Sequence, residues 1–477
     1  MNRLRLFLLL FASAALACST FLPARATPSL PGPAATLAPS PTVPPPTRTP
    51  EVMLPGGQRA CGYTPGVSVA ALPFVPPAAT PTPFPLPALP ANTPVAADVT
   101  ARQLQVWRGL WNAVNDHYVY RDFNGRDWPA IGESYRRLVQ GGLTDDDFYS
   151  AMQRMVRELG DDHSYFQDPA AVQAEAAEMA GQLDYVGVGL YILPIPAARL
   201  AAVIAVFPDS PAGEAGLGSH DLLLAVDGQP LVDETGVYTN TLRGPEGTAV
   251  TLTIQRQGGR PFDLTLTRRR VTGALPFITC LIPDVRIGYI FIPTLLDETI
   301  PAQVGAALEQ LTADGPLNGL VLDNRLNDGG QGSVLEGVLR YFTSGRLGSF
   351  VSSAKTRPLT IEPVDIGGSQ SVPLVVLVDE DTASFCEVMS GVLQASGRAK
   401  VVGRTTLGNV ETLHRYDFED GSLAWLAAEV FQPQDQPAGL WEDTGIVPDV
   451  SVPTRWDLFS EATDPALAAA VKWLTNP

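Results

Sequence analysis

The amino-acid sequence predicts a multidomain α/β protein, and three changes of pattern along the chain support this fold class. Apolar residues recur at helical spacing between residues 100 and 180, and short alternating strands follow between 181 and 272. From residue 273 onward, apolar strands alternate with helices, as in a sheet that is covered on both faces. A length of 477 residues agrees with several folded units.

The residues that precede these units have the pattern of an export signal. In "MNRLRLFLLLFASAALACST", two arginines are followed by an apolar run that is too short to span a membrane. The stretch before Cys18 resembles a bacterial lipoprotein signal, which would make Cys18 a lipidation site, whereas Ala24-Arg25-Ala26 suits an ordinary signal peptidase. Both alternatives predict export to the cell envelope or beyond, with a membrane anchor if Cys18 is acylated.

Residues 27–99 are rich in proline, threonine and alanine and predict a disordered linker. A stretch such as "PPAATPTPFPLPALP" cannot form a packed core and favours extended polyproline geometry. The chain carries 50 acidic against 32 basic residues, which disfavours nucleic acid as a partner. Its four cysteines have the spacing of neither a disulfide framework nor a zinc site. A single disulfide between Cys61 and Cys280 stays an alternative.

Residues 100–180 predict a small helical domain. One helix face is formed by apolar residues three or four positions apart, namely Leu104, Trp107, Trp111, Val114 and Tyr118. A second helix is expected after Thr144, where "TDDD" is an N-terminal capping signal. The buried stripe of this second helix ends near Gly160.

Residues 181–272 predict a β domain with one short helix at "SPAGEAGL". The stretches "DSPAGEAGLGSHDLLLAVDGQPL" and "LRGPEGTAVTLTIQR" resemble a PDZ domain. The resemblance implies that a glycine-flanked loop offers backbone amides to the terminal carboxylate of a peptide, which adds a strand to the sheet edge. In this chain the loop consists of Tyr185, Val186, Gly187 and Val188. The alternative is a packing domain without a ligand.

Residues 273–477 predict the α/β core, with strands at "RIGYIFI", "NGLVLDN", "VPLVVLVD" and "AKVVGR". Helices are expected near 299–312, 332–343 and 384–394. The motifs "GYIFIPT", "LVLDNRLNDGG", "DTASFCE" and "GIVPD" occur in the order found in C-terminal processing peptidases, also called tail-specific proteases, and in the related tricorn protease. Residues 100–455 resemble this family, which implies a crotonase/Clp-like α/β peptidase core.

The resemblance implies that Ser384 is the nucleophile, because the family serine opens the helix after a "T-A-S" stretch. A hydroxyl at a helix start lies beside backbone amides that can stabilise an oxyanion. The alternative is structural, since Ser384 and Glu387 also fit a capping box. Cys386, two residues further on, is expected to point away from the site.

The amides of the oxyanion hole are implied at two places, in the glycine turn after "NGLVLDN" and directly after the serine. The residues are Gly329 or Gly330 and Phe385. Three polar residues before the glycines are expected to support that turn rather than to react, namely Asp323, Arg325 and Asn327.

The base that activates the serine is not expected to be a lysine. Family members with a Ser–Lys dyad carry the lysine at the position of Asn409, whose amide cannot be a base. His163, in "LGDDHSYF", resembles the histidine of tricorn-like enzymes, and an imidazole with a pKa near 6.5 suits a general base at neutral pH. His414, near Asn409 in the sequence, is a reserve candidate.

A histidine base needs a third group that fixes its tautomer and orientation. Glu442, in "GLWEDTGIVPD", matches the glutamate that completes the tricorn site, and the resemblance assigns it this role. Asp162, directly before His163, is an alternative orienting group. In that case Glu442 would bind substrate or be structural.

These features predict an exported serine endopeptidase that cleaves proteins near their C-terminal tails. The PDZ-like domain would capture the tail, and no metal or other cofactor is expected. The alternative is a catalytically inactive PDZ-containing scaffold that binds peptides and lost its base with the lysine. A hydratase or thioesterase on a similar core is weaker, because PDZ-like domains serve peptides.

Overall fold

The computed structural model of the chain describes residues 52–54, 58–63, 65, 86, 88–161, 163–179, 183–232, 238–239, 241–256 and 258–476. The predicted signal segment with Cys18, most of the proline-rich linker and Asp162 lie outside the described residues. Within these ranges, no helix is both long and apolar enough to cross a membrane.

One part of the predicted linker belongs to the folded body, which corrects the prediction of a disordered linker over all of 27–99. Cys61 forms a disulfide with Cys280 in strand β9 (Ile278–Ile282). Cys61 and Tyr63 are both buried against the core. The bridge that the cysteine spacing left open is therefore formed.

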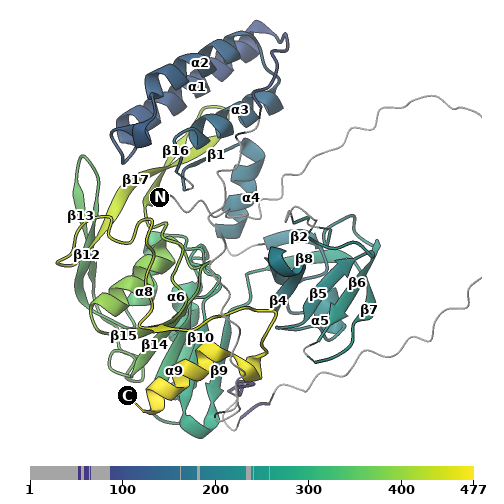
Figure 1. Ribbon diagram of the computed structural model, residues 1–477, viewed down its shortest axis with the longest axis vertical. Coiled ribbons are helices and arrows are strands. Elements are labelled where there is room, and N and C mark those ends of the chain that lie inside the picture. The colour runs from purple at the N-terminus through teal and green to yellow at the C-terminus, as the bar shows by residue number, and fades with distance from the viewer. Residues whose placement is uncertain are drawn as a thin grey trace, which may run out of the picture.

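The helical region lies at the top of Figure 1 and contains α1 (Ala97–His117), α2 (Trp128–Gln140), α3 (Asp145–Arg157) and α4 (Pro169–Met179). The first and third helices agree with the prediction. Thr144 caps α3 as expected, because its hydroxyl accepts the N–H of Asp147 at 3.2 Å. Helix α2 was not located from the sequence, and its Trp128 is fully buried in the core of this region.

The β domain, on the right of Figure 1, has an antiparallel sheet in the order β3-β4-β5-β6-β7. Its strands are β3 (Leu190–Ile195), β4 (Leu200–Val206), β5 (Leu222–Val226), β6 (Ala249–Gln255) and β7 (Phe262–Thr267). A separate two-stranded sheet joins β2 (Leu183–Gly187) to β8 (Arg269–Gly273), and the short helix is α5 (Pro211–Glu214). The predicted strands and the helix between them are confirmed.

The α/β core contains a sheet in the order β18-β15-β14-β11-β10-β9, parallel except at β9. Its further strands are β10 (Ile287–Phe291), β11 (Gly319–Asp323), β14 (Leu374–Val378), β15 (Ala399–Gly403) and β18 (Val450–Ser451). One face packs on α6 (Ile300–Thr312), α7 (Gly332–Leu339) and α8 (Phe385–Ala395), and the other packs on α9 (Pro465–Thr475). The expected sheet with two covered faces is confirmed.

A second sheet, which the sequence analysis did not predict, joins the core to the helical region. It contains β12 (Gly345–Val351), β13 (Thr356–Ile361), β16 (Thr412–Asp417) and β17 (Leu423–Pro433) from the core and β1 (Tyr165–Gln167) from the helical region. Figure 1 shows β16 and β17 extending upward to β1 and α3. Because β1 pairs with β17, the residues just before β1 are held beside the core.

The β domain docks on the core through an apolar cluster. Ala202, Ile204 and Leu222 from the β domain pack with Phe291, Leu326, Trp456 and Phe459 from the core. His220 of the β domain stacks on Trp456, with ring centroids 5.3 Å apart, and burial lowers the pKa of His220 to about 4.

Candidate active site

Ser384 lies directly before helix α8, in a backbone conformation that residues other than glycine rarely adopt. Its φ is 54° and its ψ is −132°, a combination that costs on the order of 1–3 kcal/mol for a residue other than glycine. The Ser384 N–H donates to the carbonyl of Asn409 at 2.9 Å and to Glu387 Oε2 at 3.2 Å. Strained serines at the junction of a strand and a helix are typical of hydrolase nucleophiles.

The glycine turn lies against Ser384, as the motif implied. A methyl group added to Gly329 would lie 2.6 Å from Ser384 Cβ, so only glycine fits at this position, where φ is +99°. The N–H of Gly329 is already used, because it donates to Asn327 Oδ1 at 3.0 Å. Asn327 in turn donates to the carbonyl of Ile292 at 3.1 Å, which confirms that Asn327 shapes the turn.

Of the amides predicted to bind an oxyanion, those of Gly330 and Phe385 remain the candidates. No acceptor for either N–H is found among the residues that the structure describes. Gly330 has a φ of +148° and lies so close to the backbone of Leu295 that a side chain at this position would collide with it.

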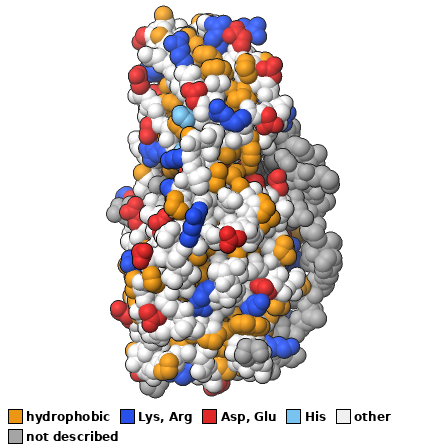
Figure 2. All heavy atoms as spheres, turned by 90° about the vertical axis from the view of Figure 1, so that its left-hand side faces the viewer, with side chains coloured by type: hydrophobic (Ala, Val, Ile, Leu, Met, Phe, Trp, Pro, Cys, Tyr) orange, Lys and Arg blue, Asp and Glu red, His pale blue; other side chains and the backbone are white. Residues whose placement is uncertain are grey.

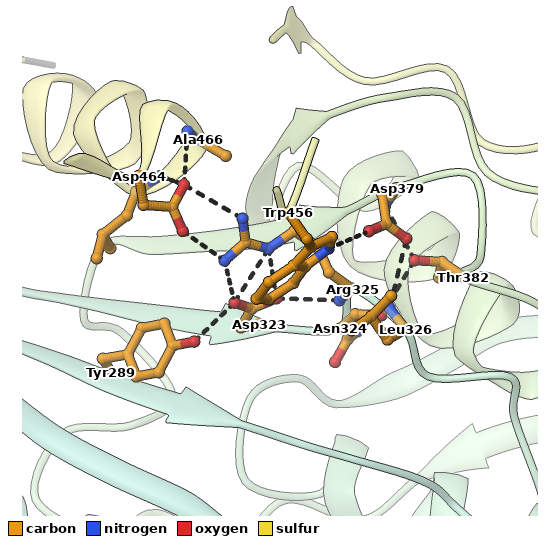
Figure 3. A network of polar contacts seen from close by, with 11 residues as sticks. Tyr289, Asp323, Asn324, Arg325, Leu326, Asp379, Thr382, Trp456, Asp464 and Ala466 are labelled. Atoms are coloured by element: carbon orange, nitrogen blue, oxygen red, sulfur yellow. Dashed lines mark hydrogen bonds and ion pairs between the residues drawn. The ribbon is translucent and has the colours of Figure 1, made fainter. Parts of the chain in front are cut away.

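A buried ionic network is centred on Arg325, which precedes the glycine turn in the sequence (Figure 3). Arg325 Nε donates to Asp323 Oδ1 at 2.9 Å, and Arg325 Nη2 donates to Asp464 Oδ2 at 2.7 Å. All three side chains are almost completely buried, and Tyr289 completes the network by donating to Asp323. The expectation that Asp323 and Arg325 form a structural pair is confirmed.

The same network reaches the β domain and the strand that leads to the serine. The indole of Trp456 lies over the guanidinium of Arg325 at 4.8 Å and contacts Asp379 Oδ2 at 3.5 Å. Asp379 directly follows β14 and accepts the N–H of Leu326, and burial raises its pKa to about 6. A pocket at this junction is lined by Ile204, His220, Tyr289, Arg325, Trp456 and Asp464, and no predicted catalytic residue lines it.

Asn409, at the position that holds lysine in Ser–Lys enzymes, is hydrogen-bonded to helix α8, which follows Ser384. Glu387, on the first turn of α8, accepts the N–H groups of Gly408 and Asn409 at 2.7 and 2.9 Å and the hydroxyl of Thr406. Complete burial raises the pKa of Glu387 to about 7. The Asn409 side chain is 5% exposed, and its Oδ1 is buried without a hydrogen-bond partner among the described residues.

His163 is held on the loop before β1 by Asp161. The backbone N–H groups of His163 and Ser164 donate to Asp161 Oδ1 at 3.0 and 2.5 Å. Tyr118, at the end of α1, donates to Asp161 Oδ2 at 2.6 Å. The imidazole Nδ1 lies 3.4 Å from Glu411 Oε2, a carboxylate that the sequence analysis did not name.

Residues 409–411 therefore link the serine, the histidine and Glu442. The carbonyl of Asn409 accepts the Ser384 N–H, the N–H of Val410 donates to Glu442 Oε2 at 3.0 Å, and Glu411 contacts His163. Consecutive Cα atoms are about 3.8 Å apart, so these three residues span less than about 8 Å. The predicted nucleophile, base and carboxyl therefore each contact the same short segment of the chain.

Glu411 and Glu442 form a buried pair of carboxyl groups with Tyr120. The Tyr120 hydroxyl donates to Glu411 Oε1 at 2.8 Å. Burial and the nearby charge of Glu411 raise the pKa of Glu442 well above its usual range. Burial also opposes ionisation of Glu411, but hydrogen bonds and the charge of His163 lower the pKa of Glu411.

His414 and Cys386 are the two other residues that the sequence analysis weighed. His414 is in β16, and its Nε2 lies 3.4 Å from Glu429 Oε2 on β17. Cys386 is completely buried, and burial raises the pKa of its thiol, as expected for a residue that points away from the site.

The predicted peptide-binding loop is mostly a strand in the structure. Tyr185, Val186 and Gly187 belong to β2 and pair with β8, whereas Val188 is buried at the turn before β3. The guanidinium of Arg243 lies 4.5 Å from the centre of the Tyr185 ring. Among the residues that the structure describes, β3 pairs with β4 alone and lies at the edge of its sheet.

Fold and site together define a class of protein, a multidomain hydrolase in which a PDZ domain flanks an α/β core with a strained serine. The model of the Tricorn protease C1 domain matches residues 101–157, and that of the PDZ domain matches 203–256. The model of peptidase family S41 matches residues 286–452.

The chain belongs to peptidase family S41. It is 31% identical over 388 residues to the carboxyl-terminal-processing protease of Synechocystis sp., covering 79% of this chain and 86% of that protein. It is 28% identical over 316 residues to the carboxy-terminal processing protease CtpA of Bacillus subtilis, covering 64% of each chain. Among solved structures, it is similar to the photosystem II D1 C-terminal processing protease, with a TM-score of 0.52, 26% identity and coverage of 78% of this chain and 100% of that one.

Proposed function

We propose that the protein is an exported serine endopeptidase that cleaves other proteins near their C-terminal tails. The observation that carries this proposal is the short segment 409–411, which contacts Ser384, His163 and Glu442 together. The relatives named carboxyl-terminal-processing proteases support the same substrate class. The PDZ domain would hold the tail by adding it as a strand to β3.

In the proposed mechanism, Ser384 Oγ attacks the scissile carbonyl and His163 accepts the serine proton. The Glu411–Glu442 carboxyl pair lies behind the imidazole and stabilises the imidazolium that forms. The N–H groups of Gly330 and Phe385 would bind the oxyanion, with help from the N-terminus of α8. His163 would then donate its proton to the leaving amine.

Two variants and a covalent probe test this proposal. Ser384→Ala and His163→Ala should each lower kcat/KM for an unstructured substrate with a free C-terminal tail by at least about 10³-fold. A fluorophosphonate probe should label the wild-type protein at Ser384 and fail to label Ser384→Ala. Full activity of His163→Ala would refute the assignment of the base. A folded protein that binds tails but is neither labelled nor active would be the peptide-binding scaffold instead.

Export is a separate part of the proposal. It is supported by the sequence of residues 1–26, and Cys18 is the proposed acylation site. Mass spectrometry of the mature N-terminus distinguishes an acylated Cys18 from cleavage after Ala26.

A further inference from the structure

We propose that Glu411 is the carboxylate that positions the His163 imidazole, and that Glu442 acts behind it as a neutral carboxylic acid that donates its proton to Glu411. This inference rests on the proposed function. It differs from the assignment that the sequence favours, in which Glu442 itself orients the imidazole.

Both carboxylate oxygens of Glu411 have a hydrogen-bond donor nearby. The Tyr120 hydroxyl donates to Oε1 at 2.8 Å, and His163 Nδ1 lies 3.4 Å from Oε2. An ionised carboxylate accepts hydrogen bonds and donates none, so it matches donors on both oxygens. The Glu411 side chain is only 3% exposed, so water does not replace these partners. Glu411 therefore fits the ionised member of the pair.

Glu411 and Glu442 must share a proton. Two ionised carboxyl groups in contact within a buried site repel each other, and one of them takes up a proton. Glu442 is the better proton carrier, because its Oε2 accepts the N–H of Val410 and the carboxyl can donate an O–H to Glu411. The same conclusion follows from the pKa of Glu442, which is raised by burial and by the charge of Glu411.

The contact with Glu411 also fixes the tautomer of His163. When Nδ1 carries the proton and donates to Glu411, Nε2 has the lone pair that a general base needs. Asp161 fixes the backbone on which this ring stands, since it accepts the N–H groups of His163 and Ser164. His163 is therefore held by two carboxylates, by Asp161 through its backbone N–H and by Glu411 through its ring nitrogen Nδ1.

The groups that face Glu411 come from several elements, and all of them bear on the pH dependence. His163 and Asp161 lie on the loop before β1, Tyr118 and Tyr120 lie at and beyond the end of α1, and Glu442 lies before β18. Glu387 on α8 adds a further negative charge near Glu442 when it is ionised. The only base among these groups is His163, so the acid limb of kcat/KM should report its protonation.

The test compares the isosteric variants Glu411→Gln and Glu442→Gln in pH profiles of kcat/KM. Glu411→Gln removes the negative charge beside the imidazole, so the acid limb should move down by about one pH unit and the plateau should fall by about 10²–10⁴-fold. Glu442→Gln keeps a donor to Glu411, so the plateau should fall by less than about tenfold and the acid limb should stay in place. The double variant should lose at least as much as Glu411→Gln, because it leaves neither carboxyl group of the pair.

Two controls separate positioning from damage to the fold. Glu429→Gln removes a buried carboxylate that also lies 3.4 Å from a histidine nitrogen, that of His414, and should not move the acid limb. Glu411→Asp keeps the charge on a shorter side chain and should restore the acid limb to within about half a pH unit of wild type. Thermal unfolding of each variant shows whether it is folded.

The inference is overturned if Glu442→Gln shifts the acid limb and loses more activity than Glu411→Gln, because Glu442 would then be the orienting carboxylate. It is also overturned if neither variant matters while Ser384→Ala and His163→Ala are inactive. These outcomes leave the proposed function intact. A folded wild-type protein that neither cleaves a tailed substrate nor is labelled by a fluorophosphonate, by contrast, refutes the proposed function itself.

Discussion

Replacement of Arg325 by methionine is predicted to destabilise the core strongly, because it leaves two buried carboxylates without their cationic partner. The Arg325 side chain is 1% exposed and bonds Asp323 and Asp464 at 2.9 and 2.7 Å. Removal of one partner from a buried ion network costs about 3–5 kcal/mol. Loss of the contact with the Trp456 ring adds about 1 kcal/mol, which the apolar methionine partly offsets. We expect a loss of about 4 kcal/mol in the free energy of unfolding.

Urea unfolding followed by tryptophan fluorescence measures this loss. The matched control is Arg102→Met, since Arg102 forms a half-exposed ion pair with Asp145 at 3.2 Å and should contribute under about 1 kcal/mol. Because Leu326 and Asn327 follow Arg325 directly in the glycine turn, the variant should also label poorly with a fluorophosphonate. A loss of less than about 1 kcal/mol, similar to that of the control, would refute the reasoning.

Three further predictions concern the turn and two buried titratable groups. Gly329→Ala should reduce fluorophosphonate labelling by at least about 10²-fold, because its methyl group would lie 2.6 Å from Ser384 Cβ, whereas Gly397→Ala, with nothing within 4 Å, should label normally. His220 has a folded pKa of about 4, below its unfolded value, so its contribution to stability is present above about pH 6.5 and is lost as the pH falls through 4. In urea unfolding, His220→Phe should remove about 3 kcal/mol of this pH dependence. An unchanged dependence of the free energy of unfolding on pH would contradict this prediction. Glu387 has a folded pKa raised to about 7, so it favours the folded state below about pH 4.5 and loses this contribution as the pH rises through 7. Glu387→Gln should therefore reduce the fall in the free energy of unfolding over this pH range. An equal fall in the variant and the wild type would count against the burial of a charge at this position.

The sequence predicted the order of the elements well, because hydrophobic periodicity and capping are local. The strand "NGLVLDN" became β11, and the cap at Thr144 formed with Asp147 as its partner. The glycine turn was also placed correctly, since positive φ angles at Gly329 and Gly330 are what these residues permit. Ser384 and its turn were singled out by the resemblance to the peptidase family, and their proposed roles remain predictions.

What the sequence did not show depends on pairing between distant segments. Nothing in the alternation of β1 or β17 indicates that these two strands pair, since periodicity reports which face is buried and not which strand lies alongside. Glu411 escaped notice for the same reason. Its partner His163 is 248 residues away, so no spacing in the sequence joins them.

The pairing of β1 with β17 has a consequence for how the site is assembled. The region that matches peptidase family S41 begins at residue 286 and contains the alcohol and both acids of the proposed chemistry, but the imidazole of His163 lies outside this region, on the loop just before the three-residue strand β1. A polypeptide cut down to that region would be chemically incomplete. In the proposed mechanism, separation of β1 from β17 would displace the base while the serine stays in place, and renewed pairing of the two strands would restore the site.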